Sequence, residues 1–402
     1  MAGPIRMVNR QVTGSNSSWM QVLIWGSAHA INDGYPTLYL PLLPLLMLRW
    51  HFGVSQAGLL AGLLALTTQA LQPFLGAWAD RRGGPWFVVG GLLIGALGNA
   101  LGLALSPAYW IFAIALMLGG LGNASFHPHM AALVSLRHKD HPGRNMSGWM
   151  VSGMLGHILA PLAVVALWKW GGAPSVAILA VPGLLAALAL YPSAKTVPTP
   201  SRPEKRTKTK MNWKAWPAMW KRGGVFLGIV ALRSMGSASL LTLLPIVWDH
   251  RGGSSAETGA LLAVVYAGGM VGNLLGGSLS DALGPRLVLG GSLLGSGLAA
   301  ALGGMATAGI GWPFWLAVGI WGFLVNGAGA VVIVYGQSLF PGNLGMASGL
   351  TMGLGSTMGA FGAWAVGAVA QWHGLSMAVD AAALCLILAT VPVGWLRKPA
   401  LQ

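Results

Sequence analysis

Residues 76–83 read GAWADRRG and lie between two long apolar runs of the chain. A degenerate copy, GSLSDALG, occupies residues 277–284, again between two apolar runs. The aspartate and the final glycine recur at the same interval of about 200 residues. A duplicated, charged, glycine-bounded turn inside an apolar chain predicts a membrane transporter built from two repeated halves.

The composition supports a membrane protein independently of this motif. Hydrophobic residues make up 55% of the 402 residues, charged residues only 8%, and the mean hydropathy is +0.67. A soluble domain carries about 25% charged residues. The 61 glycines lie largely within apolar runs, where small residues allow transmembrane helices to approach closely.

Twelve stretches are long and apolar enough to cross a hydrocarbon core of ~30 Å, which needs ~20 residues of helix. We therefore expect an all-α integral membrane fold of twelve helices in two pseudo-symmetric halves of six. The expected halves are residues 1–192 and 223–402, joined by a basic linker at 193–222. The expected spans are 20–48, 53–76, 85–106, 108–133, 147–168, 173–192, 223–248, 257–279, 286–308, 312–340, 344–371 and 375–396.

The basic residues are distributed unevenly about these spans. With both termini on one side, that side carries 19 of the 23 lysines and arginines, nine of them in residues 195–222. The positive-inside rule then places both termini and the linker in the cytoplasm. The net charge of +15 is explained by this asymmetry, so we expect no nucleic-acid partner, although the linker could contact anionic lipid.

Two further features restrict the interpretation. The single cysteine, Cys385, lies within the last expected span, so a disulfide framework is excluded. Residues 1–18 are polar, and the apolar run after them is too long for the core of a cleavable signal. We expect that run to remain as the first helix.

The repeated loops are candidate gates. In the first, Gly76 allows close packing, Asp80 can face the positive N-terminal end of a helix, and Arg81 can pair with a carboxylate or a carbonyl end. Such contacts would hold one side of the transporter closed. Alternatively, the loop charges only fix topology. The candidate gating residues are Gly76, Asp80, Arg81 and Gly83 in the first copy, and Gly277, Asp281, Gly284 and Arg286 in the second.

Polar residues within the first span form one face. His29, Asn32 and Asp33 are spaced i, i+3 and i+4, so they share one side of a helix. An ionised group near the bilayer centre costs ~2.5–3.5 kcal/mol or more, which makes each a functional candidate. Burial favours the neutral form of a carboxyl group, so Asp33 is suited to reversible proton uptake. The alternative is that Asp33 caps a broken helix, since Gly34 and Pro36 follow.

The fourth span carries two histidines around a proline. Pro128 removes a backbone donor and kinks the helix, which aims His127 into the protein. We expect His127, His129 and His157 to line a cavity, with His127 and His129 as additional proton relays. Histidines together with Asp33 could also hold a transition metal. The spacing favours no particular metal and cysteine ligands are missing, so we expect neither a metal nor a cofactor.

Arg233 is the one basic residue that lies away from all span ends. Three interpretations remain open: it pairs with Asp33, it contacts an anionic group of a substrate, or it forms a structural salt bridge. The remaining intramembrane acid, Asp380, is expected to be structural.

The first gating loop resembles the signature of the major facilitator superfamily, Gly-x-x-x-Asp-Arg-x-Gly followed by a basic residue. Gly76, Asp80, Arg81 and Gly83 match it, whereas Gly84 replaces the basic residue. The resemblance implies two six-helix halves around a central cavity, alternating access for a small-molecule substrate, and a monomer in the lipid bilayer.

Four further stretches resemble the fosmidomycin resistance protein family, a branch of proton-driven drug exporters. They are AHAINDGY at 28–35, LQP at 71–73, SFHP at 125–128, and YGQSLFPG at 335–342 followed by GMASGL at 345–350. The resemblance adds Tyr35 and Gln337 to the expected cavity lining. His129, Ser338 and Asn343 stand where the family has glutamate, glutamate and commonly arginine.

The sequence thus predicts a proton-coupled exporter of a small organic molecule or drug in the bacterial inner membrane, with protons carried by Asp33. Rivals are an uptake symporter or facilitator for a small organic anion anchored by Arg233, and a metal or metal-chelate exporter using His29, His127 and His129. An enzyme with His127 and Asp33 as acid and base is not expected, because no nucleophile motif or nucleotide loop accompanies them. A non-transporting receptor is equally disfavoured.

Overall fold

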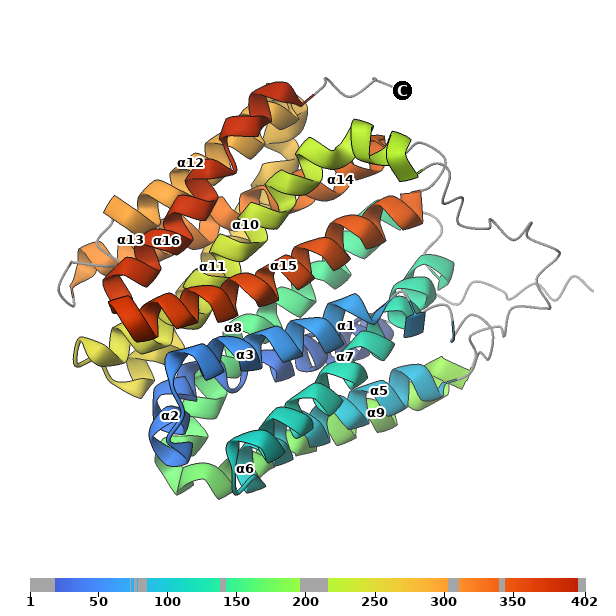
Figure 1. Ribbon diagram of the computed structural model, residues 1–402. Coiled ribbons are helices and arrows are strands. Elements are labelled where there is room, and N and C mark those ends of the chain that lie inside the picture. Colours follow the sequence, from blue (N-terminus) through green and yellow to red (C-terminus); the bar gives the residue numbers. More distant parts are fainter. Residues whose placement is uncertain are drawn as a thin grey trace, which may run out of the picture.

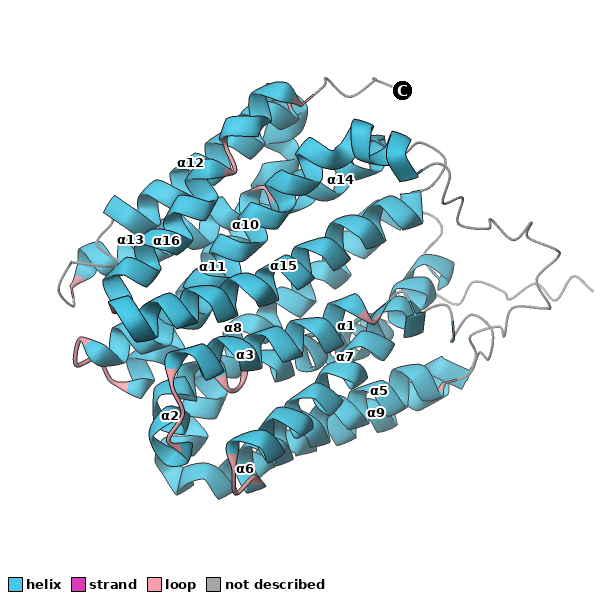
Figure 2. Ribbon diagram, in the orientation of Figure 1, coloured by secondary structure: helices cyan, strands magenta, loops and turns pink. Residues whose placement is uncertain are grey.

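The computed structural model describes residues 19–72, 74–75, 78, 85–137, 142–195, 216–302, 311–339 and 344–396. Figure 2 shows these residues as helices joined by short loops, with no strand among them. The all-α expectation is confirmed. The first gating loop, residues 76–77 and 79–84, lies outside the described part, as do 196–215 of the linker. The boundaries 192 and 223 between the expected halves therefore stay a prediction.

The helices form two bundles, which Figure 1 shows side by side. The N-terminal bundle comprises α1 (Trp19–Gly34), η1 (Tyr35–Thr37), η2 (Leu40–Leu42), α2 (Leu43–Trp50), α3 (Val54–Ala65), η3 (Leu66–Ala70), α5 (Trp86–Ala96), η4 (Leu97–Leu101), α6 (Gly102–Leu105), α7 (Tyr109–Arg137), α8 (Pro142–Ser175), η5 (Val176–Leu179) and α9 (Ala180–Lys195). The C-terminal bundle comprises α10 (Trp216–His250), α11 (Ser255–Leu283), α12 (Pro285–Leu302), α13 (Trp312–Gly327), α14 (Gly329–Leu339), α15 (Leu344–His373), α16 (Leu375–Leu388) and η7 (Val391–Trp395).

The two bundles meet along two pairs of helices. α3 packs against α15, and α8 packs against α11. Neighbouring rods alternate in direction, so α2, α6 and the last residues of α10 and α15 lie at one end, called here the Trp50 end, on the left in Figure 1. The last residues of α9 and the first of α10 and α15 lie at the opposite end, called the Lys195 end.

Several described stretches can cross a membrane by length and apolar composition: Trp86–Leu105, Tyr109–His127, Trp149–Lys195, Gly223–His250, Ser255–Ser280 and Leu375–Trp395. Exposed tryptophans mark both ends of the bundles. Trp110, Trp170, Trp312 and Trp372 lie at helix ends on the Trp50 side, and Trp86 and Trp395 on the other. Tryptophan concentrates at the membrane–water interface, so this distribution fits a multi-pass membrane protein.

The first expected span is broken rather than continuous. Pro36, Pro41 and Pro44 each lack an N–H, and the rod passes through two short 3-10 turns before α2 resumes. α8 approaches α1 so closely that a Cβ on Gly156 would overlap the carbonyl of Ala30. The break ends α1 next to α7 and α8, and this junction holds the polar residues of the first span.

Candidate functional site

The carboxylate of Asp33 lies between two imidazoles. Its Oδ2 is 3.1 Å from Nε2 of His29, one turn earlier on α1, and its Oδ1 is 2.9 Å from Nε2 of His127 on α7. The i, i+4 spacing on α1 and the inward direction of His127 were both predicted from the sequence, and the structure places these groups together. With Asn32 they form what we call the Asp33 cluster.

The second ring nitrogen of His29 reveals where one proton of this cluster lies. Nδ1 is 2.6 Å from the backbone oxygen of Trp149, and a carbonyl oxygen only accepts hydrogen bonds, so Nδ1 carries a hydrogen. Nε2 therefore either carries a second proton that it donates to Asp33, or accepts one from a protonated Asp33. In both cases one proton lies between His29 and Asp33.

Neighbouring groups fix the cluster in place. The indole of Trp149 on α8 stacks on His29, with ring centroids 3.7 Å apart and planes 9° apart. Asn32 Nδ2 donates to Asp33 Oδ1 at 3.2 Å, and Asn123 Nδ2 donates to the backbone oxygen of Asn32 at 3.1 Å. This arrangement makes Asp33 a poor candidate for a cap, because it lies in the last turn of α1, where the helix dipole disfavours a negative charge.

Access to the cluster is unequal. His29 retains 2% of its side-chain exposure, whereas Asp33 retains 13% and His127 23%. A proton from water therefore reaches the cluster through Asp33 or His127. His29 is the enclosed member, held by α8.

An aromatic contact between described residues leads from this region to the C-terminal bundle. His157, one turn after Gly153 on α8, stacks on Tyr266 of α11, with centroids 5.1 Å apart and planes 22° apart. Nδ1 of His157 is buried and has no hydrogen-bond partner among the described residues. Tyr266 in turn lines a cavity between the bundles.

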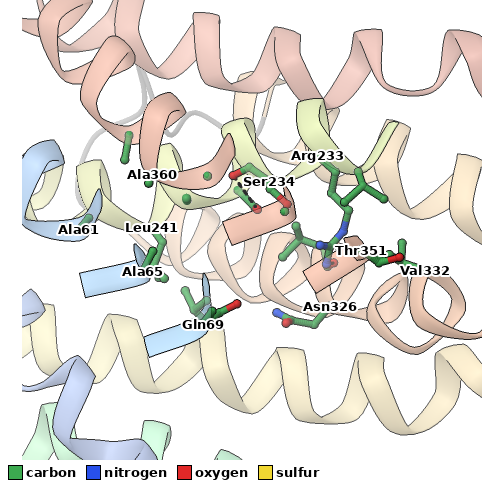
Figure 3. Close-up of a pocket in the computed structure, with 18 of the residues that line it drawn as sticks. Ala61, Ala65, Gln69, Arg233, Ser234, Leu241, Asn326, Val332, Thr351 and Ala360 are labelled. Carbon is green, nitrogen blue, oxygen red and sulfur yellow. Dashed lines mark hydrogen bonds between the residues drawn. The ribbon is translucent and has the colours of Figure 1, made fainter. Parts of the chain in front are cut away.

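This cavity, called the Arg233 cavity, has a volume of about 410 Å³. α3 and η3 contribute to it from the N-terminal bundle, and α10, α11, α13, α14 and α15 from the other. Figure 3 shows Arg233 above the facing amides of Gln69 and Asn326. Arg233 donates from Nη2 to the carbonyl of Val325 at 2.7 Å.

Arg233 and Tyr35 have neighbours that differ from those considered from the sequence. Among the described residues, the ion pairs within 4 Å both involve Asp33 and its histidines, so Arg233 does not pair with Asp33. Tyr35 does not line the Arg233 cavity: its hydroxyl donates to the carbonyl of Leu179 at 2.8 Å, and its ring packs at Gly183 of α9. Helical spacing fixes which residues share a face, but not which neighbour that face meets.

Other predicted residues lie elsewhere or outside the description. The side chains of His129, Gln337 and Asp281 are outside the described part, as are Gly76, Asp80, Arg81 and Gly83. In the second loop, Gly284 ends α11 with a φ of 87°, Gly277 has open space beside it, and Arg286 has a buried Nε without a partner. The gating role of both loops stays a prediction.

Neutral members of the cavity were not predicted from the sequence. Gln69, Asn326 and Trp321 line it, yet attention to ionisable side chains alone passes over them. Asn326 could have been identified from the sequence, because an amide within an apolar span also requires a polar partner or a cavity. His29, Asp33 and His127 additionally offer ligand atoms within 4.8 Å of one another, a set that a transition metal accepts.

Comparison with known proteins agrees with this architecture. A family model described as "Major Facilitator Superfamily" matches residues 27–246. An uncharacterized MFS-type transporter, YfnC of Bacillus subtilis, is 28% identical over 96% of this chain and 95% of its own. The fosmidomycin resistance protein of Escherichia coli is 26% identical over 91% and 90%.

Solved structures support the same fold. A bacterial homolog of the human lysosomal transporter Spinster superposes with a TM-score of 0.76 at 17% identity, covering 95% of this chain and 97% of that one. The nucleoside transporter NupG gives 0.74 at 13% identity, covering 93% and 98%. Fold, cavity and intramembrane charges thus define a multi-pass, all-α membrane transporter. The chain belongs to the major facilitator superfamily.

Proposed function

We propose that this protein is a proton-coupled secondary transporter that exports a small organic molecule across the bacterial inner membrane by alternating access. The observation that carries the proposal is the Asp33 carboxylate, held inside the membrane-spanning part between Nε2 of His29 and Nε2 of His127. An intramembrane carboxylate with two titratable partners is typical of a proton relay.

The proton step follows from the hydrogen-bond pattern. At rest one proton lies on the His29–Asp33 contact, and His127 donates an Nε2–H to Oδ1 of Asp33. A second proton, entering through the partly exposed Asp33 or His127, neutralises the carboxylate and leaves the cluster with one extra positive charge. The ionic contacts between α1 and α7 then weaken, and loss of that proton to the other side restores them.

α8 connects the proton step to the substrate. Gly153 lies directly against Asp33 and His29, and His157, one turn later, contacts Tyr266 in the cavity wall. A change of position at the cluster therefore reaches the wall of the Arg233 cavity through one rigid helix. Rocking of the two bundles around that cavity would alternate its access.

Orientation and direction rest on separate arguments. The positive-inside rule supports cytoplasmic termini and a cytoplasmic linker. Because the linker follows Lys195, the Lys195 end is then cytoplasmic and the Trp50 end periplasmic. Export is supported by similarity to the fosmidomycin resistance protein, because a transporter that confers resistance to a drug does so by removing it from the cell. Uptake of an organic anion is the second candidate, favoured by Arg233, which has no described acid partner. Flux in everted and right-side-out vesicles distinguishes the two.

The test compares two matched substitutions. Everted vesicles are energised, followed with a pH-sensitive dye, and challenged with phosphonates, cationic drugs and small carboxylates. We expect Asp33→Asn to abolish substrate-dependent proton release while the protein still folds. Asp380→Asn, the same change at an exposed acid of α16, is expected to retain it. Proton release that persists in Asp33→Asn would remove this residue from the mechanism.

A further inference from the structure

Two buried hydrogen-bond donors in the wall of the Arg233 cavity have no partner among the described residues. They are Nε of Arg233 on α10 and Nε1 of Trp321 on α13, and both residues line the cavity. Among the described residues, the guanidinium of Arg233 donates from Nη2 to the carbonyl of Val325. Buried donors without acceptors are unfavourable, and a charged donor more so, so an acceptor that approached these two side chains would stabilise this wall of the cavity.

The charge of the cavity lining also favours a ligand with hydrogen-bond acceptors, and specifically an anion. Its lining contains a guanidinium but neither aspartate nor glutamate. The described ion pairs all belong to the Asp33 cluster, so no described carboxylate within 4 Å compensates Arg233. A buried cation requires a counter-charge, and a guanidinium presents a planar fork that matches the oxygens of carboxylate, phosphonate or sulfonate.

The other side chains that line the cavity indicate the chemistry of the uncharged part of the ligand. Small and apolar side chains, including Ala61, Ala65 and Leu241, form much of the wall on the α3 side and along α10. Asn326 adds an amide opposite Gln69 (Figure 3). A volume of about 410 Å³ lies in the range of pockets for small organic ligands.

We infer that the Arg233 cavity binds a small organic oxyanion, whose charged oxygens meet Arg233 and Trp321 and whose apolar body packs against the wall of α3 and α10. The cavity discriminates against cations, since its only described charge is positive. The inference takes this cavity as the substrate site of the proposed function. Anion binding itself needs no proton gradient.

A matched series of ligands tests this on the purified full-length protein. The anions are 2-naphthoate, naphthalene-2-sulfonate and 2-naphthylphosphonate, and their counterparts on the same ring are 2-naphthamide and 2-naphthylmethylamine. Calorimetry and thermal shift report binding at fixed pH. We expect at least one anion to bind about tenfold or more tightly than both counterparts, the difference that a charge-assisted hydrogen bond supplies. Inorganic phosphate alone is expected to bind weakly, because it lacks the apolar body.

Substitutions then assign the effect to the cavity. Arg233→Gln is expected to abolish the preference for anions, Arg233→Lys to retain part of it, and Trp321→Phe to weaken the anions severalfold. Arg49→Gln, the same change at an exposed arginine near the Trp50 end, is expected to have no effect. Because Arg233→Lys keeps the charge, it remains informative if Arg233→Gln does not fold.

Several outcomes would overturn the inference. These are amine or amide binding as tight as any anion, failure of all three anions at millimolar concentration, an anion preference that survives in Arg233→Gln, or phosphate that binds as well as the naphthyl anions. The proposed function is judged separately with Asp33→Asn, which should still bind the anion. Proton-coupled flux of cations alone would refute the anion site and leave the coupling intact.

Discussion

At the scale of single residues, the close packing of the Asp33 cluster depends on Gly153 of α8, which has no side chain. A Cβ on Gly153 would overlap Oδ2 of Asp33 and lie 2.6 Å from Cε1 of His29. We therefore predict that Gly153→Ala separates His29 from Asp33 and lowers proton-coupled transport strongly. Overpacking of this kind also costs about 1–3 kcal/mol in the free energy of unfolding. Flux in vesicles and thermal unfolding of the purified protein measure the two effects.

Gly90 on α5 provides the matched control for this substitution. A Cβ there meets nothing within 4 Å. Gly90→Ala should leave transport unchanged and stabilise the helix by up to about 1 kcal/mol through propensity. Equal behaviour of the two alanine variants would show that the close contact at Gly153 has no role in the cluster.

The residues of the cluster were predictable to different degrees. Spacing alone grouped His29, Asn32 and Asp33, because i, i+3 and i+4 share a face of any α-helix. The hydrogen bond from His29 to the carbonyl of Trp149 was not predictable, since it depends on how α8 is rotated and shifted against α1. The same limit explains why Arg233 was open to pairing with Asp33, although the structure places it in a separate cavity.

At the scale of elements, the sequence predicted the spans but not their internal irregularities. Proline explained the break after α1, whereas the π-helical turns η3 and η4 carried no comparable signal. In η3, the hydroxyls of Thr67 and Thr68 donate to the carbonyls of Leu63 and Leu64, which competes with regular α-helical bonding. Threonine has this option in any helix, so its use is decided by the packing of α7 and α15 around η3.

We expect α3 and α15 to move relative to each other during transport. A Cβ on Gly58 would overlap the carbonyl of Ala363 and lie 2.9 Å from Cα of Trp364. Because both backbones are rigid, Gly58→Ala should push the helices apart near the Trp50 end and favour states open there. Spin labels on His51 and Trp372, both exposed at this end, would report a longer distance in a Cys385→Ser background.

Gly291 on α12 is the control for this helix contact, because a Cβ there meets nothing within 4 Å. Gly291→Ala should leave the distance between the labels unchanged. If Gly58→Ala also leaves the distance distribution unchanged, α3 and α15 do not limit opening at this end.

At the scale of the whole molecule, the proposed proton site and most of the proposed substrate site lie in different bundles. The Asp33 cluster belongs to the N-terminal bundle, whereas most of the Arg233 cavity, including Arg233 itself, belongs to the C-terminal bundle. Described contacts between the bundles include backbone approaches at glycine, the stack of His157 on Tyr266, and the packing of η2 against α11. In the proposed mechanism, proton and substrate influence one another through the relative position of the bundles, so a covalent link between the bundles should stop transport.

A disulfide between the bundles tests this division directly. A Cβ built on Gly62 of α3 lies 3.4 Å from Cβ of Ala360 on α15, close to the ~3.5–4.5 Å of natural disulfides. In a Cys385→Ser background, we predict that oxidation of Gly62→Cys/Ala360→Cys stops transport and that reduction restores it. The reason is that the cross-link holds the bundles in one relative orientation, so the cavity opens to one side at most.

A second pair separates the effect of the link from that of the substitutions. Gly359 precedes Ala360 on α15, and its Cβ would lie 3.2 Å from that of Ala238 on α10, within the C-terminal bundle. Ala360 of the first pair and both residues of the second line the Arg233 cavity, so each pair disturbs that lining. Oxidised Ala238→Cys/Gly359→Cys should therefore retain the flux of its reduced form. If the oxidised link across the bundles also retains full flux, transport does not require the bundles to part at α3 and α15, and the rocking mechanism is wrong for this protein.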